Sequence, residues 1–281
     1  MFLLTDRTPR RSAWAHFAQK NQCNSGTSSK DKDMNGYSYQ LYSSRNFQPL
    51  ERTLTMLRDL GYRRVEGYGG IYGDPVRLKK DLDALGLSMP TGHFGLDMLE
   101  NEVSRVLEIA KVADMKAIFC PYLDADRRPD SVAGWQEFGK RLVAAGEPYR
   151  KEGYAFGWHN HDFEFRPLAD GSVPQEHIMN ASPDLAWEAD IAWIIKGGAD
   201  PLEWIERYGD RILAVHVKDI AVNGEKADED GWEDVGHGTV DWPALFTALR
   251  KTPARYFIME HDNPSDDTRF ASRSIETVRT F

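Results

Sequence analysis

Short apolar runs alternate with longer segments of helical periodicity eight times between Tyr37 and the end of the chain. Strands separated by helices in this way form parallel sheets, because each parallel pairing needs a long crossover connection. Eight β/α alternations in about 245 residues, without a long linker, favour one closed (β/α)₈ TIM barrel of the α/β class. A doubly wound open sheet is the main alternative, but no GxGxxG or P-loop motif opens any expected helix.

The expected strands are short and rich in apolar or β-branched residues. They cover Ser38–Tyr42, Arg64–Glu66, Ser88–His93, Ala117–Pro121, Ala155–Asn160, Leu185–Asp190, Ile212–Val217 and Tyr256–Glu260. The expected helices place their apolar residues on one face, as Leu54, Leu57 and Leu60 do. They cover Pro49–Leu60, Pro75–Leu85, Leu96–Ala113, Ser131–Glu152, Pro201–Tyr208, Trp242–Arg250 and about Asp266–Val278.

Three glycines, Gly61, Gly86 and Gly153, stand where an expected helix ends and the next strand begins. The residue after a helix often adopts a left-handed conformation with positive φ, which glycine tolerates without steric cost. These positions therefore predict the same helix-to-strand turn three times.

Residues 1–33 differ from the rest of the chain. The stretch QKNQCNSGTSSKDKD is polar and has no apolar periodicity, which predicts disorder. We therefore expect a disordered extension over residues 1–33 and one barrel domain over residues 34–281.

The N-terminus carries an Arg pair, but no apolar segment of signal-peptide length follows it. No apolar run approaches the roughly 20 residues that span a bilayer. Two cysteines, Cys23 and Cys120, are too few for a disulfide framework. These features predict a cytoplasmic protein without a membrane partner. The net charge of −9, without a cluster of Lys and Arg, argues against nucleic acid as a partner but not against a small phosphorylated substrate.

Polar side chains gather at the carboxyl ends of seven expected strands. They are Gln40, Glu66, His93, His159 with His161, Glu188 with Asp190, His216 with Lys218, and Glu260 with His261 and Asp262. In a TIM barrel these ends meet at one mouth, where active sites are built. A single histidine at a strand end is more often structural, but seven such ends together indicate a functional site.

Burying several carboxylates and imidazoles together is costly unless something pairs them. A divalent cation is the simplest partner, because carboxylates and neutral imidazoles are its usual ligands. Asp190, His216 and Glu260 come from three consecutive expected strands, and only a barrel would bring them together. The metal prediction therefore depends on the fold prediction.

The fifth expected strand reads GWHNHDFEF. Alternation along a strand points His159 and His161 the same way, with Asn160 opposite. Both histidines could face a metal or a substrate, or one could only orient its neighbour by hydrogen bonding.

Eight segments carry a resemblance to known proteins: GYSYQLYSSR, YRRVEGYGG, MPTGH, WHNHDFEF, WEADIAWIIKGGADPLEWI, RILAVHVKD, VGHGTVDWPAL and FIMEHD. Together they resemble the xylose isomerase-like TIM barrels, which include sugar epimerases, hydroxypyruvate isomerases, inosose dehydratases and AP endonuclease relatives. The resemblance implies a divalent metal held by His159, Asp190, His216 and Glu260. Ketose epimerases of this family usually carry Glu at the position of His159. The His-Asn-His sequence here is more similar to the inosose dehydratase branch.

By this resemblance, the cation would chelate a substrate carbonyl and an adjacent hydroxyl, and Glu260 or His161 would remove the α-proton to give an ene-diolate. Isomerisation, epimerisation and dehydration share that intermediate. We therefore predict a sugar or polyol isomerase or epimerase, with a dehydratase of an inosose or dehydroshikimate type as the alternative. Mn²⁺ is the first choice of metal, and Mg²⁺, Co²⁺ and Zn²⁺ remain alternatives.

Five further residues are candidates for substrate contacts. Lys218 lies two residues after His216 and could bind a substrate oxygen or protonate a leaving hydroxyl; the alternative is a salt bridge with Asp219 or a neighbouring Glu. Gln40, Glu66 and His93 are candidates for contacts with substrate hydroxyls, and Trp187 for an apolar wall against the sugar. The acidic segment NGEKADEDGWED could form a mobile lid or a plain solvated loop.

Two other functions share the expected barrel. A metal-dependent phosphodiesterase of the endonuclease type needs several metals, additional His ligands and a basic groove, which the net charge of −9 disfavours. A non-catalytic barrel could bind a sugar for sensing or as a subunit of a larger complex. For either function, the sequence leaves a homo-oligomer open. The acid and base groups around the expected metal favour catalysis over binding alone.

Overall fold

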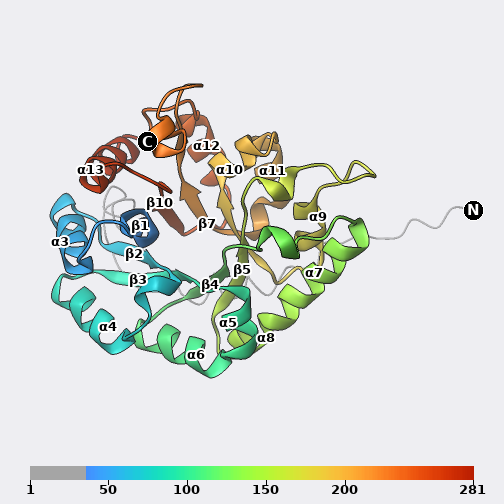
Figure 1. Cartoon of the computed structure of the whole chain (residues 1–281), viewed down its shortest axis with the longest axis horizontal. Helices are drawn as coiled ribbons and strands as arrows, with labels where there is room; N and C mark the ends of the chain where they lie inside the picture. Colours follow the sequence, from blue (N-terminus) through green and yellow to red (C-terminus); the bar gives the residue numbers. More distant parts are fainter. Residues whose placement is uncertain (1–35) are drawn as a thin grey trace, which may run out of the picture.

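The apolar runs form eight parallel strands that close into one barrel, in the order β1-β10-β7-β6-β5-β4-β3-β2 (Figure 1). The structure is a computed structural model, and it describes residues 36–281. The barrel strands are β1 Tyr37–Gln40, β2 Arg64–Gly67, β3 Ser88–His93, β4 Ala117–Cys120, β5 Ala155–His159, β6 Ala186–Asp190, β7 Ile212–Val217 and β10 Tyr256–Met259. The predicted (β/α)₈ barrel is confirmed, and the extension expected over residues 1–33 lies outside the described residues.

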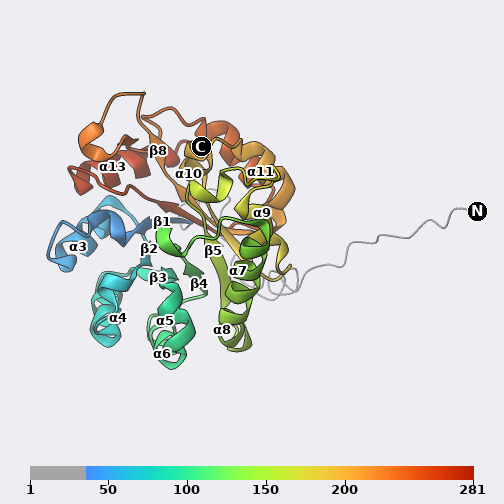
Figure 2. The ribbon, with the colours of Figure 1, turned by 45° about the vertical axis from the view of Figure 1, so that its right-hand side comes forward.

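Helices surround the strands on all sides (Figure 2). They are α3 Leu50–Leu60, α4 Pro75–Ala84, α5 Leu96–Asn101, α6 Val103–Val112, α7 Val132–Ala145, α8 Glu147–Lys151, α9 Pro174–Asn180, α10 Ile191–Lys196, α11 Pro201–Tyr208, α12 Trp242–Leu249 and α13 Asp267–Val278. None of these helices combines the length and the hydropathy that crossing a membrane requires.

Two expected helices are each divided in the structure. The segment Leu96–Ala113 is interrupted at Glu102, whose backbone leaves the helical region at φ −123° and ψ 39°. The segment Ser131–Glu152 is interrupted at Gly146, and Pro148 lies in the first turn of the second helix. Proline is tolerated there because the amide groups of a first helical turn have no partner within the helix. Gly61, Gly86 and Gly153 have φ of 92°, 66° and 90°, which confirms the three predicted turns.

The barrel interior is polar at the carboxyl ends of the strands and apolar on the side of their amino ends. A small cluster from the lower parts of five strands fills the interior: Ala117, Phe119, Ala155, Ala186, Leu213, Ala214 and Ile258. Gly157 makes room for it, since a Cβ there would lie 2.8 Å from the ring of Phe119 and 2.4 Å from the carbonyl oxygen of Ala186. The larger hydrophobic core lies between the strands and the surrounding helices. The polar strand ends are therefore supported from below by packed apolar residues.

The segment after β7 is ordered by a short antiparallel pair, β8 Asp219–Ile220 with β9 Trp232–Glu233. Ion pairs tie it to α13: Arg269 contacts Glu229 at 2.8 Å and Asp234 at 3.1 Å. Glu229 also accepts a hydrogen bond from the backbone N of Ser265 at 3.0 Å. The acidic segment expected as a lid or a solvated loop is thus held against the C-terminal helix.

Candidate metal centre

A cavity of about 370 Å³ opens at the carboxyl ends of the strands. Of the predicted site residues, His93, His159, His161 and Glu260 line it. Asp262 lines it as well, two residues beyond Glu260. The strand ends therefore meet at one mouth, as the barrel prediction required.

The four predicted metal ligands come together beneath this cavity. His159 ends β5, Asp190 ends β6, His216 lies on β7 and Glu260 directly follows β10; one ligand atom of each lies within 4.8 Å of the others. His216 Nδ1 is 2.8 Å from Glu260 Oε2 and 3.9 Å from Asp190 Oδ2. Ligand atoms about 2.0–2.2 Å from a shared cation lie roughly 3–3.5 Å from one another. The four atoms are therefore close enough that small side-chain movements would let them share one divalent ion.

Two buried atoms of this set have unused hydrogen-bonding capacity. His159 Nδ1 and Asp190 Oδ2 have no hydrogen-bond partner among the described residues. Burial raises the pKa of Asp190 to about 7, despite the charge of Lys218 nearby. Leaving buried polar atoms unsatisfied costs about 1–3 kcal/mol each. A divalent cation would use these atoms and favour the ionised carboxylate, so the residues present fit such an ion.

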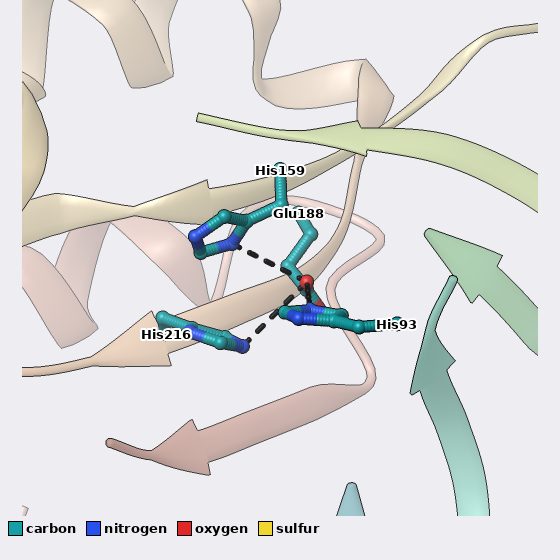
Figure 3. Close-up of side chains that lie close together, drawn as sticks. All are labelled: His93, His159, Glu188 and His216. Atoms are coloured by element: carbon teal, nitrogen blue, oxygen red, sulfur yellow. Dashed lines mark hydrogen bonds and ion pairs between the residues drawn. The ribbon is translucent and has the colours of Figure 1, made fainter. Parts of the chain in front are cut away.

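A second cluster shares two of these histidines. Figure 3 shows the carboxylate of Glu188 directed at the imidazoles of His93, His159 and His216. Glu188 Oε2 lies 2.5 Å from His93 Nε2, 3.3 Å from His159 Nδ1 and 3.5 Å from His216 Nε2. Burial, together with the charge of Glu66, raises the pKa of Glu188 to about 7. This second set could also hold a cation. Because His159 and His216 belong to both sets, a cation bound here would replace one bound at the first set.

Glu188 is missing from the ligands and catalytic residues predicted from the sequence. The signal that identifies it is the alternation along β6, since Glu188 and Asp190 are two residues apart and both face the barrel interior.

Gln40 and Glu66, which the sequence predicts as substrate contacts, lie beside His216 and not on the cavity wall. Both side chains are fully buried, and neither lines the cavity. Glu66 Oε1 lies 2.7 Å from His216 Nε2 and accepts a hydrogen bond from Gln40 Nε2 at 2.8 Å. A carboxylate on the far nitrogen of an imidazole fixes the ring orientation at metal sites. Here it leaves His216 Nδ1 directed toward Glu260.

Trp187 also differs from its prediction as a wall of the substrate site. Its indole Nε1 donates to Asn160 Oδ1 at 2.8 Å, and its ring centroid lies 6.3 Å from that of Trp204 on α11. The ring therefore packs between the strands and the helices, outside the barrel. The reason is the alternation on β6, which turns Trp187 outward because Glu188 is turned inward.

Lys218 is fully buried in a group of carboxylates. Its ammonium bonds Asp262 and lies 3.3 Å from Glu260 Oε2 and 3.8 Å from Asp190 Oδ2. Burial disfavours its charge, but these carboxylates outweigh burial and raise the pKa of Lys218. Asp219, one of the partners considered from the sequence, instead accepts backbone N–H bonds from Gly236 at 2.8 Å and Val240 at 3.0 Å. Lys218 therefore forms ion pairs with these carboxylates beneath the cavity.

The expected alternation at the end of β5 is confirmed. The ring centroids of His159 and His161 lie 5.0 Å apart, whereas Asn160 faces away and accepts hydrogen bonds from Trp187 Nε1 and Asp190 N. Burial and the charge of Lys218 lower the pKa of His161 to about 3. His161 is therefore a neutral imidazole at the side of the cavity.

Glu164 supports this strand end and links stability to pH. Its carboxylate accepts hydrogen bonds from Trp158 Nε1 and from the backbone N of His161, both at 2.9 Å. Burial raises its pKa from 4.5 to about 8. An acid with a raised pKa in the folded state binds its proton more tightly there than in the unfolded chain. Its contribution to stability is complete below its unfolded pKa and is lost as the pH rises toward 8.

We expect Glu164→Gln, which cannot ionise, to lose less stability than the parent protein between about pH 5 and pH 8. Denaturant unfolding of both proteins in EDTA across this range measures the difference in unfolding free energy. Glu176→Gln, which removes a partly exposed partner of Arg207, is the matched control and should keep a constant difference. If the difference in unfolding free energy between Glu164→Gln and the parent protein is also independent of pH, the raised pKa of Glu164 is contradicted.

Comparisons with known proteins agree with the barrel fold. The family model described as xylose isomerase-like TIM barrel matches residues 54–280. The rhizopine catabolism protein MocC of Rhizobium meliloti is 24% identical over 242 residues, which are 75% of this chain and 74% of that protein. A sugar phosphate isomerase/epimerase structure from Parabacteroides distasonis has a TM-score of 0.74 at 20% identity, covering 91% of this chain and 96% of that one. The IOLI protein, solved with a bound zinc atom, has a TM-score of 0.67 at 14% identity, covering 87% and 95%. Since the family model matches most of its length, the chain belongs to the xylose isomerase-like TIM barrel family.

Proposed function

We propose that the protein is a divalent-metal-dependent isomerase or epimerase that acts on a small keto-sugar or polyol through an ene-diolate. The observation that carries the proposal is the convergence of His159, Asp190, His216 and Glu260 beneath a cavity of sugar size. A bound divalent cation would polarise a substrate carbonyl and lower the cost of removing the neighbouring proton. Mn²⁺ is the first choice, and the zinc in the IOLI structure supports a divalent cation without selecting one.

The residues around the cavity supply the remaining parts of this chemistry. Glu260 lines the cavity. Burial alone would raise the pKa of its carboxyl, but the charges of Lys218 and His216 outweigh burial and hold that pKa well below the ordinary value. It is therefore ionised and placed to take a proton from a substrate carbon. His161 lines the cavity beside it as a neutral imidazole, which suits proton transfer or a hydrogen bond to a substrate oxygen. His93 also faces the cavity and can contact a substrate hydroxyl.

Dehydration of a keto-polyol is the second candidate reaction. Two carboxyl groups, Glu260 and Asp262, line the cavity. Glu260 could remove the α-proton and return it to the leaving hydroxyl, which departs as water, while Asp262, paired with Lys218, accepts a hydrogen bond from a substrate hydroxyl. Both reactions begin with the same proton removal, so the products distinguish them.

We expect deuterium to enter the carbon next to the carbonyl when Mn²⁺-loaded protein is incubated in D₂O with a panel of keto-sugars and inososes. NMR after removal of the metal by EDTA reads both the exchange and the products, and loss of water marks the dehydratase reaction. Protein kept in EDTA throughout is the control and should give no exchange. Metal-loaded protein that exchanges no proton on any member of the panel would contradict the proposal.

A further inference from the structure

The walls of the cavity above the candidate metal centre are aromatic and carry no cation. Tyr42, Tyr68 and Tyr122 line them, and Tyr42 and Tyr122 keep 37% and 42% of their surface exposed. Apart from its histidines, the charged side chains that line the cavity within residues 36–281 are Glu260 and Asp262. The lining is therefore acidic where the chemistry takes place and uncharged elsewhere.

The cations near the cavity are engaged elsewhere. Arg45 donates to the carbonyl oxygens of Tyr42 and Asp262, and its guanidinium lies 3.9 Å from the ring centroid of Tyr42. Arg128 lies 3.6 Å over the ring of Phe163 and donates to the carbonyl oxygen of Leu123. Lys218 is buried in its ion pair with Asp262. None of the three lines the cavity.

A phosphate group is usually held by cationic side chains, and no Arg or Lys among residues 36–281 lines the cavity. Phosphate carries about −1.5 to −2 charges at neutral pH and is bound in proteins by Arg, Lys or several backbone N–H groups. The proposed divalent ion would bind the carbonyl end of the sugar, so a phosphate at the other end would lie near Asp262 and the tyrosines without a cation to pair with. An uncharged sugar needs no such cation, and its C–H face can pack on the tyrosine rings while its hydroxyls bond their OH groups.

We infer that the site takes an unphosphorylated keto-sugar or keto-polyol and discriminates against the phosphate ester of the same sugar. The inference rests on the proposed function, because it describes the substrate of that reaction. It attributes the discrimination to the absence of Arg and Lys from the cavity wall among the described residues. Adding a lysine to that wall therefore tests the cause.

Two glycines of the wall give room for an added cation. A Cβ built on Gly69 or Gly95 would meet no atom within 4 Å, and neither residue has a positive φ. Both line the cavity. Gly73 is equally open but lies outside the lining, so Gly73→Lys adds the same charge without placing it at the site.

Saturation-transfer difference NMR with Mg²⁺-loaded protein tests the inference as binding, without turnover. The probes are D-fructose with D-fructose 6-phosphate, D-tagatose with D-tagatose 6-phosphate, and inorganic phosphate as competitor. We expect the free sugar of at least one pair to bind about tenfold or more tightly than its ester. Inorganic phosphate should not displace it.

Gly69→Lys should raise the affinity for the ester about tenfold, whereas Gly73→Lys should leave it unchanged. Gly95→Lys replaces Gly69→Lys if the first variant does not fold. An ester that binds the parent protein as tightly as its free sugar would overturn the inference, as would free sugars that all fail to bind. If free sugars bind more tightly than their esters but no member of the D₂O panel exchanges a proton, the proposed reaction is refuted and the preference for unphosphorylated sugars stands.

Discussion

Asp190→Asn is expected to abolish metal-dependent proton exchange while leaving the fold intact. Asp190 Oδ2 faces the proposed ion, and Asp190 Oδ1 accepts the backbone N–H of Trp193 at 2.9 Å, which caps α10. Asparagine keeps an oxygen for the cap but loses the negative charge that a divalent cation requires. We expect exchange to fall by at least about 10²–10³-fold, which is the loss found when a single transition-state-stabilising group is removed.

Isothermal titration of EDTA-treated protein measures the Mn²⁺ affinity, and deuterium exchange measures the rate of proton removal from the substrate. The matched control is Asp200→Asn, which makes the same chemical change at the cap of α11, where Asp200 accepts the N–H of Leu202 at 2.8 Å. The control should keep the parent's Mn²⁺ affinity and exchange rate. Parent-like Mn²⁺ affinity in Asp190→Asn would remove Asp190 from the metal site.

Lys218→Met is expected to lower the unfolding free energy by about 3–5 kcal/mol, the usual cost of leaving buried charges without their partner. The variant leaves the carboxylates of Asp190, Glu260 and Asp262 without the ammonium that contacts all three. Methionine fills a similar volume between the rings of Trp193 and Trp232, so lost packing contributes little. Urea denaturation in EDTA gives the difference in unfolding free energy.

Lys196→Met is the matched control, because Lys196 stacks on the same Trp232 ring at 3.4 Å but is exposed to solvent. Its removal should cost only about 0–1 kcal/mol. Adding Asp262→Asn to Lys218→Met should restore part of the stability, since one uncompensated charge disappears. Equal losses for the two lysine variants would show that Lys218 contributes through packing on tryptophan and not through its charge.

The barrel and the convergence of His159, Asp190, His216 and Glu260 could be predicted from the sequence because both depend on simple periodicities. The strands are short apolar runs, and seven of the eight end with a polar group at the place where a TIM barrel builds its site. Strand alternation also predicted correctly that His159 and His161 share a face and that Asn160 opposes them. Helix α10 was not predicted, because its six residues are too few for a periodic pattern; the side chain of Asp190 caps its first turn.

The periodicity of the sequence does not show how far a side chain lies from the cavity. The contacts of Gln40, Glu66, Trp187 and Lys218 depend on that position. A residue at a strand end can face the cavity, as His93 does, or lie beneath another side chain, as Glu66 lies beneath His216. Strand alternation places the side chain of Trp187 outside the barrel, whereas its aromatic character alone suggests a wall of a sugar site. The three tyrosines of the cavity come from the segments that follow strands β1, β2 and β4, where no periodic pattern marks an inward-facing side chain.

Anomalous scattering from Mn²⁺-loaded crystals tests the central proposal most directly. We expect one strong peak per chain among His159, Asp190, His216 and Glu260, with ligand distances of roughly 2.0–2.3 Å. A peak among His93, His159, Glu188 and His216 instead, or no peak within the barrel mouth, would contradict the proposed metal centre.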